Sequence, residues 1–291
     1  MSLKTAAIVF LISSAALGLS ACSRDAGASA STRAASPAPA PAAAASPAPA
    51  QSYDPEHPEL QKGWNGNTKY ESFAKVKKVL FKRVFNDHRE TIYCGFSYTD
   101  QKQMVLPSGF EAKDAVRAKR LEWEHIVPAE NFGRAFVEWR EGSPACTKEN
   151  SGKPFRGRRC ADLASREYRL MQADMYNLYP ADGAVNGARQ NYDFTEFEQG
   201  TKPSFGTCPM KVYDRRAEPR DEVKGLIART YKYMDWAYPK YRMSDQTRKL
   251  MDAWDKTHPV TSWECTRAKR IEGLQGNANP FTADACRKAG L

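Results

Sequence analysis

The stretch from Ser23 to about Ser52 is rich in Ala, Pro and Ser, and it confines the fold to the residues that follow it. Proline fixes the backbone φ angle and has no N–H to donate, so the repeats at 36–41 and 46–49 predict a semi-stiff, extended tether without a core. No second segment of this kind and no internal repeat follows. We therefore expect one folded domain over 53–291, with enough hydrophobic residues for a core.

Residues 1–22, ahead of the tether, have the pattern of an export signal. Lys4 supplies the positive charge, and Ala6 to Leu19 is an apolar stretch that is too short for a comfortable membrane span. The segment ends in Leu19-Ser20-Ala21-Cys22, which is similar to a bacterial lipobox, where the cysteine is lipidated and becomes the new N-terminus. The alternative is ordinary cleavage nearby, with Cys22 incidental. Both predict a periplasmic or extracellular protein, and a lipid would anchor it to the cell envelope.

Six cysteines remain when Cys22 is set aside, and an even number in an exported chain predicts three disulfides. Six cysteines allow 15 connectivities, so the pairing is a hypothesis. We expect the local pairs Cys146–Cys160 and Cys265–Cys286, which leaves Cys94 with Cys208. A metal site is the alternative, and it is disfavoured because no CxxC spacing occurs and the four histidines are scattered.

Hydrophobic periodicity predicts an α+β domain that is mainly helical. The expected helices are 70–86, 129–141, 163–174, 181–191, 221–238, 244–256 and 261–274, the expected strands are 91–98 and 120–127, and 142–162 is expected to be a long loop. Thr261 followed three residues later by Glu264 is the pattern of a capping box at the start of the last of these helices.

Glu124 and His125 form the most informative pair in the chain, at the end of the expected strand and just before Pro128. Histidine is the natural general base at neutral pH, and a carboxylate suits Mg²⁺, which takes few protein ligands. Adjacent residues of an ideal strand point to opposite faces, so the strand must end or twist here if both side chains are to share a site. The alternative is an ordinary surface pair.

Three asparagines, Asn177, Asn186 and Asn191, follow within a short distance of one another. Asparagine is a poor helix former, yet its side chain offers a neutral oxygen to a metal and an amide donor to the backbone. Capping and turn formation around Gly183 and Gly187 explain the same residues equally well.

These segments together resemble the bacterial endonuclease I family of periplasmic and secreted nucleases, which carry a ββα-metal (His-Me finger) motif. The matching pieces are Ile92 to Gly95, Arg120 to Ala129, Arg169 to Met171, Asp174 to Pro180, Gly183 to Tyr192, Ile227 to Tyr231 with Tyr233-Met234, Trp263 to Cys265 and Gln275 to Phe281. They occur in the same order over roughly residues 70–286, so the resemblance is more specific than any one motif.

The resemblance implies a role for each matching residue. His125 would be the general base, and Glu124 and Asn186 would hold one Mg²⁺, with Asn177 and Asn191 in support. An arginine from the loop before Cys160 would bind the scissile phosphate; Arg156, Arg158 and Arg159 all lie there, and we select Arg158. The chain also departs from the family pattern. Gln172 replaces a usual Glu, Tyr176 stands where His is common, the loop 141–160 is longer, and one disulfide fewer is present.

We therefore expect a Mg²⁺-dependent endonuclease that cleaves DNA, and also RNA, with little sequence preference. The formal net charge of +10 agrees with a polyanionic substrate, and we expect no protein partner. Two other functions remain open. A non-catalytic envelope lipoprotein that binds DNA would explain the charge and the tether but not the Glu-His and Asn residues. A structural envelope protein would explain the lipid and tether alone.

Overall fold

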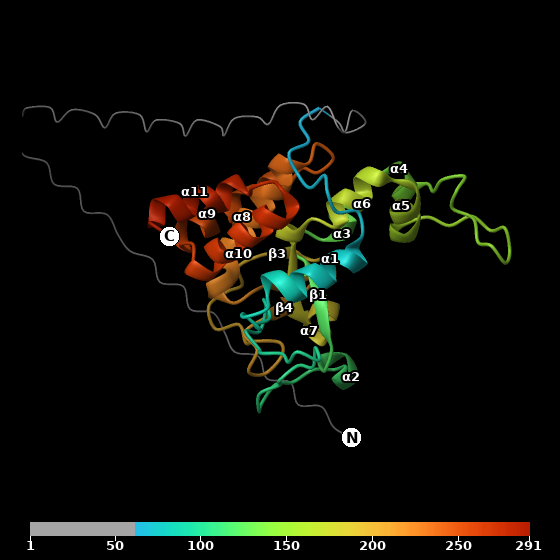
Figure 1. Ribbon diagram of the computed structural model, residues 1–291. Helices are drawn as coiled ribbons and strands as arrows, with labels where there is room; N and C mark the ends of the chain where they lie inside the picture. The colour runs from blue at the N-terminus through green and yellow to red at the C-terminus, as the bar shows by residue number, and fades with distance from the viewer. Residues whose placement is uncertain (1–61) are drawn as a thin grey trace, which may run out of the picture. The chain divides into compact units, whose positions relative to one another are not determined.

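The computed structural model describes residues 62–291 (Figure 1). The expected export signal, the lipidation of Cys22, the tether and the domain start at residue 53 lie outside the described residues. Within 62–291, no helix is both long enough and apolar enough to cross a membrane.

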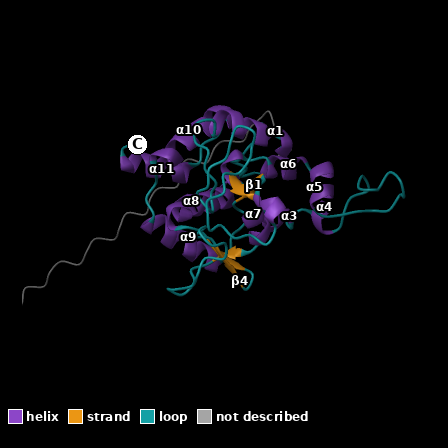
Figure 2. Ribbon diagram, turned by 90° about the horizontal axis from the view of Figure 1, so that it is seen from below, coloured by secondary structure: helices purple, strands orange, loops and turns teal. Residues whose placement is uncertain are grey.

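Two groups of helices lie on opposite sides of strand β1 (Leu121–His125), as Figures 1 and 2 both show. The C-terminal group consists of α8 (Asp221–Ala237), α9 (Asp245–Thr257), α10 (Ser262–Gln275) and α11 (Pro280–Ala289). The other group consists of α3 (Ala129–Gly133), α4 (Val137–Arg140), α5 (Arg158–Ala164) and α6 (Arg166–Gln172). The first helix, α1 (Phe73–Val79), continues into a π-helical turn, η1 (Leu80–Val84), that packs on α10.

Strand β1 pairs antiparallel with β2 (Leu178–Asp182), so that Glu124 lies opposite Tyr179 and His125 opposite Leu178. Helix α7 (Gly183–Arg189) begins directly after β2, because the Asp182 carboxylate accepts hydrogen bonds from the free N–H groups of the first turn. This strand–strand–helix unit carries the candidate site. The remaining elements are α2 (Ala115–Ala118), the 3₁₀ turn η2 (Met175–Asn177), and a small sheet of β3 (Asp193–Phe194), β5 (Arg216–Glu218) and β4 (Lys211–Tyr213) in that spatial order.

A buried carboxylate, Asp174, fixes the entry to β2. It is fully buried and accepts hydrogen bonds from the hydroxyls of Tyr233 and Tyr238 and from the Gln275 amide. Burial raises the pKa of Asp174, and these hydrogen bonds oppose the rise. Because the donors come from α8, the end of that helix and α10, the network ties the C-terminal helices to the strand that leads to the site.

The local parts of the sequence interpretation are confirmed. The structure contains the disulfides Cys94–Cys208, Cys146–Cys160 and Cys265–Cys286. The strand over 120–127 and the helices at 221–238, 244–256 and 261–274 are also present, each within a few residues. The capping box forms only in part. Thr261 accepts from the Glu264 N–H, but the Glu264 carboxylate binds Arg229 instead of the Thr261 backbone.

Several other expectations were wrong. Residues 91–98 form turns and isolated bridges instead of a strand, because the chain folds back on itself there: the Gly95 N–H donates to the Thr91 oxygen, and Gly95 has a positive φ. The expected helix 129–141 is two short helices, α3 and α4, and the expected loop 142–162 ends early because α5 starts at Arg158. The expected helix 181–191 starts only at Gly183, since the residues before it belong to β2. Helix α11, strands β3 to β5 and the short helix α2 had not been foreseen, and the second strand of the motif, β2, was implied by the resemblance without a position in the sequence.

We predict that the Cys94–Cys208 disulfide contributes more to stability than Cys146–Cys160, because it closes a loop of 114 residues against 14. Loop-closure entropy gives about 4.7 kcal/mol for a loop of about 100 residues and about 3 kcal/mol for about 15. Replacing both cysteines of each pair by alanine and measuring urea unfolding should give a difference of about 2 kcal/mol. Equal losses in the two double variants would contradict this order.

Candidate active site

One face of β1 packs against one face of α7, and the side chains on the two faces meet in pairs. Glu122 and Glu124 are two apart on a strand and share one face, while Asn186 and Arg189 are three apart on a helix and share one face. The two faces meet pairwise. Asn186 Nδ2 donates to Glu122 Oε2 at 2.8 Å, and an Arg189 guanidinium nitrogen donates to Glu124 Oε1 at 2.8 Å. The register of the strand thereby sets the position of the helix.

Glu124 is held through one carboxylate oxygen only. Its Oε1 accepts from the Tyr93 hydroxyl at 2.7 Å as well as from Arg189. No described residue donates to Oε2, and Glu124 lines a pocket of about 440 Å³ together with His125 and Asn186. Burial raises the pKa of Glu124, while the Arg189 charge and the Tyr93 hydroxyl oppose the rise. One oxygen therefore anchors the side chain and the other remains for a ligand.

Arg189 is the central residue that the sequence did not reveal. It is completely buried and donates to the backbone oxygens of His125 (3.2 Å) and Ile126 (2.8 Å) in addition to Glu124. Its guanidinium also stacks on the Phe194 ring. Burial opposes its charge, but its acidic and phenolic neighbours raise the pKa of Arg189 above the usual value. The one available signal was its position three residues after Asn186.

Asn186 presents its amide in a defined orientation. Its NH₂ group is bound to Glu122, and no described residue donates to its Oδ1. Glu122 is in turn held by a bidentate pair with Arg117, at 2.9 and 2.8 Å. Gly187 makes this pair fit, because a Cβ there would lie 2.3 Å from an Arg117 guanidinium nitrogen. Gly187 thus serves close packing within a helix and does not form the turn that its sequence context allowed.

His125 is placed to act as a base. The strand ends at this residue, and its ring packs between Phe73 and Phe132 while still lining the pocket beside Glu124. Its Nε2 lies 2.9 Å from the backbone oxygen of Gln172. A carbonyl can only accept, so Nε2 carries the proton and Nδ1 of the neutral ring keeps a lone pair. Burial and the nearby charge of Arg158 lower the pKa of His125 from 6.5 to about 3.

Two of the departures from the family pattern, Gln172 and Tyr176, lie close to this site and leave its geometry intact. The His125 ring donates from Nε2 to the main-chain oxygen of Gln172, whose side chain donates to Asp162. Tyr176 is buried and donates to the backbone oxygens of Ala268 and Asn277. Neither side chain lines the pocket of His125.

Of the three loop arginines, Arg158 alone lines the pocket, where its guanidinium stacks on Phe73. Arg156 donates to the Arg140 backbone, and Arg159 stacks on Phe155. The asparagines also differ. Asn191 lines the pocket and donates to Glu130, whereas Asn177 lies outside it and binds both the N–H and the C=O of Val127.

The free oxygens of Glu124 and Asn186 suit a hard cation. Among residues 62–291 no group of three or more His, Cys, Asp or Glu side chains is arranged to hold a metal. Mg²⁺ keeps several waters and is usually bound through one or two protein oxygens, so the donor pair Glu124 Oε2 and Asn186 Oδ1 fits this ion.

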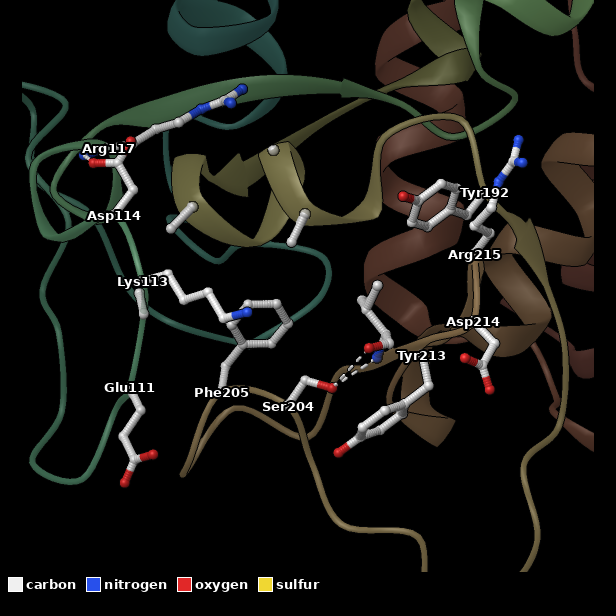
Figure 3. Close-up of a pocket in the computed structure, with 15 residues that line it drawn as sticks. Glu111, Lys113, Asp114, Arg117, Tyr192, Ser204, Phe205, Tyr213, Asp214 and Arg215 are labelled. Carbon is white, nitrogen blue, oxygen red and sulfur yellow. Dashed lines mark hydrogen bonds between the residues drawn. The ribbon is translucent and has the colours of Figure 1, made fainter.

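A larger cavity, of about 760 Å³, lies on the other side of α7 and shares only Arg117 and Gly187 with the site pocket (Figure 3). Its charged lining is balanced, with three acidic and three basic side chains. These are Glu111, Asp114 and Asp214, and Lys113, Arg117 and Arg215. It contains no histidine, so the smaller pocket is the better candidate for chemistry.

Comparison with known proteins gives a consistent match. Residues 67–286 match the family model described as Endonuclease I. The chain is 39% identical to a periplasmic deoxyribonuclease of Aeromonas hydrophila, over 75% of this chain and 87% of that protein. It is 32% identical to Endonuclease-1 of Buchnera aphidicola, over 75% and 83% of the two chains. A more limited match is to an extracellular ribonuclease of Bacillus subtilis, 36% identical over 37% of this chain and 42% of the relative.

We predict that the His125 ring stays neutral between pH 8 and pH 5, because its pKa is lowered to about 3 by burial. The unfolded chain takes up this proton near pH 6.5 and the folded chain does not, so stability falls as the pH falls below about 6.5. NMR titration without divalent ions, with the resonance assigned from a His125→Asn variant, measures this directly. An inflection of the His125 resonance near pH 6.5 would contradict the prediction.

We also predict that Arg189→Met destabilises the protein by about 3–5 kcal/mol, because it leaves the Glu124 carboxylate buried without its partner. In a Glu124→Gln background the same substitution should cost clearly less, since no unpaired charge remains. Arg248→Met, which removes a half-exposed pair with Asp235, is the matched control and should cost less than about 1 kcal/mol. Urea unfolding with the disulfides intact gives all of these values. A loss for Arg189→Met as small as the control's would refute the central role of this pair.

Proposed function

Because the chain belongs to the Endonuclease I family, and is therefore an endonuclease that hydrolyses phosphodiester bonds, we propose that His125, Glu124, Asn186 and Arg158 form its active site. The observation that carries this proposal is their convergence on one pocket. It brings together a basic ring nitrogen, two uncommitted oxygens and a guanidinium. On this proposal β1, β2 and α7 constitute the ββα-metal motif of the domain 53–291.

The ring of His125 acts as the general base. A water near Nδ1 gives its proton to this nitrogen as its oxygen bonds to phosphorus, and the bond from phosphorus to O3′ breaks on the opposite side. The products are a 5′-phosphate and a 3′-hydroxyl, which takes its proton from solvent. The backbone oxygen of Gln172 then holds the imidazolium by its Nε2 proton, which keeps the ring in position for the next cycle.

Glu124 Oε2 and Asn186 Oδ1 would hold one Mg²⁺ ion. Such an ion supplies positive charge that neutralises the charge developing on phosphate oxygens in the transition state. Arg158 contributes a guanidinium at the same pocket, whose planar donors match two oxygens of a phosphate. The pairs Arg189–Glu124 and Glu122–Asn186 position the two ligands and do not touch the substrate.

The substrate on this proposal is DNA, and also RNA. The match to relatives that are named deoxyribonucleases covers most of the chain, and the match to an extracellular ribonuclease covers a shorter part of it. A site of one base, one ion and one guanidinium contacts the phosphodiester backbone and not the base edges. Backbone contacts carry no sequence information. Cleavage should therefore show little sequence preference and should weaken steeply with added salt.

Export also belongs to the proposal. Three disulfides are typical of proteins that fold in an oxidising compartment, and two of the relatives are named periplasmic and extracellular. The signal-like residues 1–22 and the tether 23–52 would deliver the nuclease to the periplasm or beyond. Lipid on Cys22 would hold it at an envelope membrane.

The test is plasmid cleavage by the oxidatively folded protein in the presence of Mg²⁺. We expect smeared degradation that EDTA abolishes and that His125→Ala slows by about 10²–10⁴-fold, the usual contribution of a general base. His258→Ala is the matched control, because His258 lies at the end of α9 and does not line the pocket. It should cleave at the wild-type rate.

Two outcomes would count against the proposal. Equal loss of activity in both histidine variants would indicate a general effect on folding and would remove the specific role of His125. Intact plasmid that is nevertheless retarded on a gel would favour the alternative of a non-catalytic DNA-binding lipoprotein.

A further inference from the structure

A narrow hairpin projects from the body of the protein next to α4 and α5, as Figures 1 and 2 both show. We define residues 146–156 as the basic arm. Its two sides are joined by hydrogen bonds from Phe155 N–H to Cys146 O and from Lys148 N–H to Lys153 O. The Cys146–Cys160 disulfide, with both cysteines buried, fixes its base. An element with so little burial of its own depends on this covalent link to keep its shape.

The exposed charged side chains of the basic arm are mainly cationic. Lys148, Lys153 and Arg156 are exposed, and Glu149 is the one acidic residue in the arm. None of these three cations has an ion-pair partner among residues 62–291. In the body many arginines are paired, for example Arg117 with Glu122, Arg229 with Glu264 and Arg270 with Asp87.

The basic arm leads directly to the proposed active site. Arg158 follows Arg156 by two residues and lines the pocket that holds His125. Each side of the arm has about five residues, which at about 3.3 Å per residue span about 15 Å. That length is roughly the rise of four to five base pairs at about 3.4 Å each. The larger cavity beyond α7, with its balanced charges, offers a polyanion no comparable attraction.

We propose that the basic arm is a second contact site for the nucleic-acid substrate and binds phosphates several nucleotides away from the bond that is cut. This inference rests on the proposed nuclease function and extends it. The tip of the arm, Thr147 to Lys153, carries no large apolar side chain, so it suits a phosphate backbone better than an apolar protein surface. Because the disulfide holds the arm in place before the substrate arrives, less conformational freedom is lost on binding.

The arm should act on substrate binding and leave the chemical step unchanged. We compare the wild type with the triple variant Lys148→Ala/Lys153→Ala/Arg156→Ala in cleavage of long duplex DNA and of bis(p-nitrophenyl) phosphate. The small diester cannot reach the arm, so its cleavage rate should not change. On long DNA the KM should rise while kcat stays the same.

Salt dependence makes the test quantitative. Three lost phosphate contacts reduce the slope of log affinity against log salt by up to about 2.7. The KM of the variant divided by the KM of the wild type, both on long DNA, should therefore fall by up to about 40-fold between 50 mM and 200 mM salt. The charge-conserving variant Lys148→Arg/Lys153→Arg/Arg156→Lys should restore the wild-type KM.

The matched control is Lys256→Ala/Lys269→Ala/Lys288→Ala, which removes three exposed lysines from α9, α10 and α11 on the other side of β1 (Figure 1). A KM and a salt slope on long DNA that are equal in the arm variant and this control would overturn the inference. Loss of binding to anionic phospholipid vesicles with unchanged DNA kinetics would also overturn it, in favour of a membrane contact. Failure of the proposed function itself is distinguishable, because the wild type would then cleave neither substrate.

Discussion

The buried guanidinium of Arg189 is the constraint on which the rest of the site depends. A fully buried cation needs compensating partners, and here the carboxylate of Glu124 and the backbone oxygens of His125 and Ile126 accept from its two terminal nitrogens, while Nε has no partner among the described residues. All three partners belong to the end of β1 or follow it directly. Helix α7 can therefore dock in only one place, and that place brings Asn186 beside Glu122. The proposed ligand oxygens of Glu124 and Asn186 are brought to the same pocket by this docking.

Local signals in the sequence predicted the parts of the fold that depend on near neighbours. Apolar residues at helical spacing predicted the long C-terminal helices, and two disulfides join cysteines 14 and 21 residues apart. Strand β2 could not be found in this way. Its sequence Leu-Tyr-Pro-Ala-Asp is buried at every position and shows no alternation, and it is a strand because β1, more than fifty residues earlier, pairs with it. Residues 91–98 are the opposite case, since their composition favours a strand but a turn with Gly95 at positive φ interrupts it.

In the candidate site, too, some residues could be predicted from the sequence, while others depend on contacts between distant parts of the chain. The resemblance to the family predicted four site residues, and the structure places all of them around one pocket. They are His125, Glu124, Asn186 and Arg158. The residues that orient them were missed, because Tyr93, Arg117 and Glu122 act through pairings across the fold. Asn177 was expected to support the site; it lies outside the pocket and binds the backbone of Val127, just after the end of β1. Residue type alone does not distinguish a ligand from a side chain that holds a neighbouring backbone.

The net charge of +10 says little about the attraction of a polyanionic substrate until the cations held in ion pairs are set apart from the unpaired ones. A cation within hydrogen-bond distance of a carboxylate contributes little to the field that a distant phosphate experiences, so the arginines of the body stabilise the fold more than they attract DNA. The effective charge is then that of the unpaired and exposed groups. Around the catalytic pocket these include Arg158 and the cations of the basic arm, and Arg158 also helps to keep the His125 ring unprotonated. On the proposed function, a positive rim therefore attracts the polyanion but also weakens the base, because a lower pKa makes the His125 ring a poorer proton acceptor.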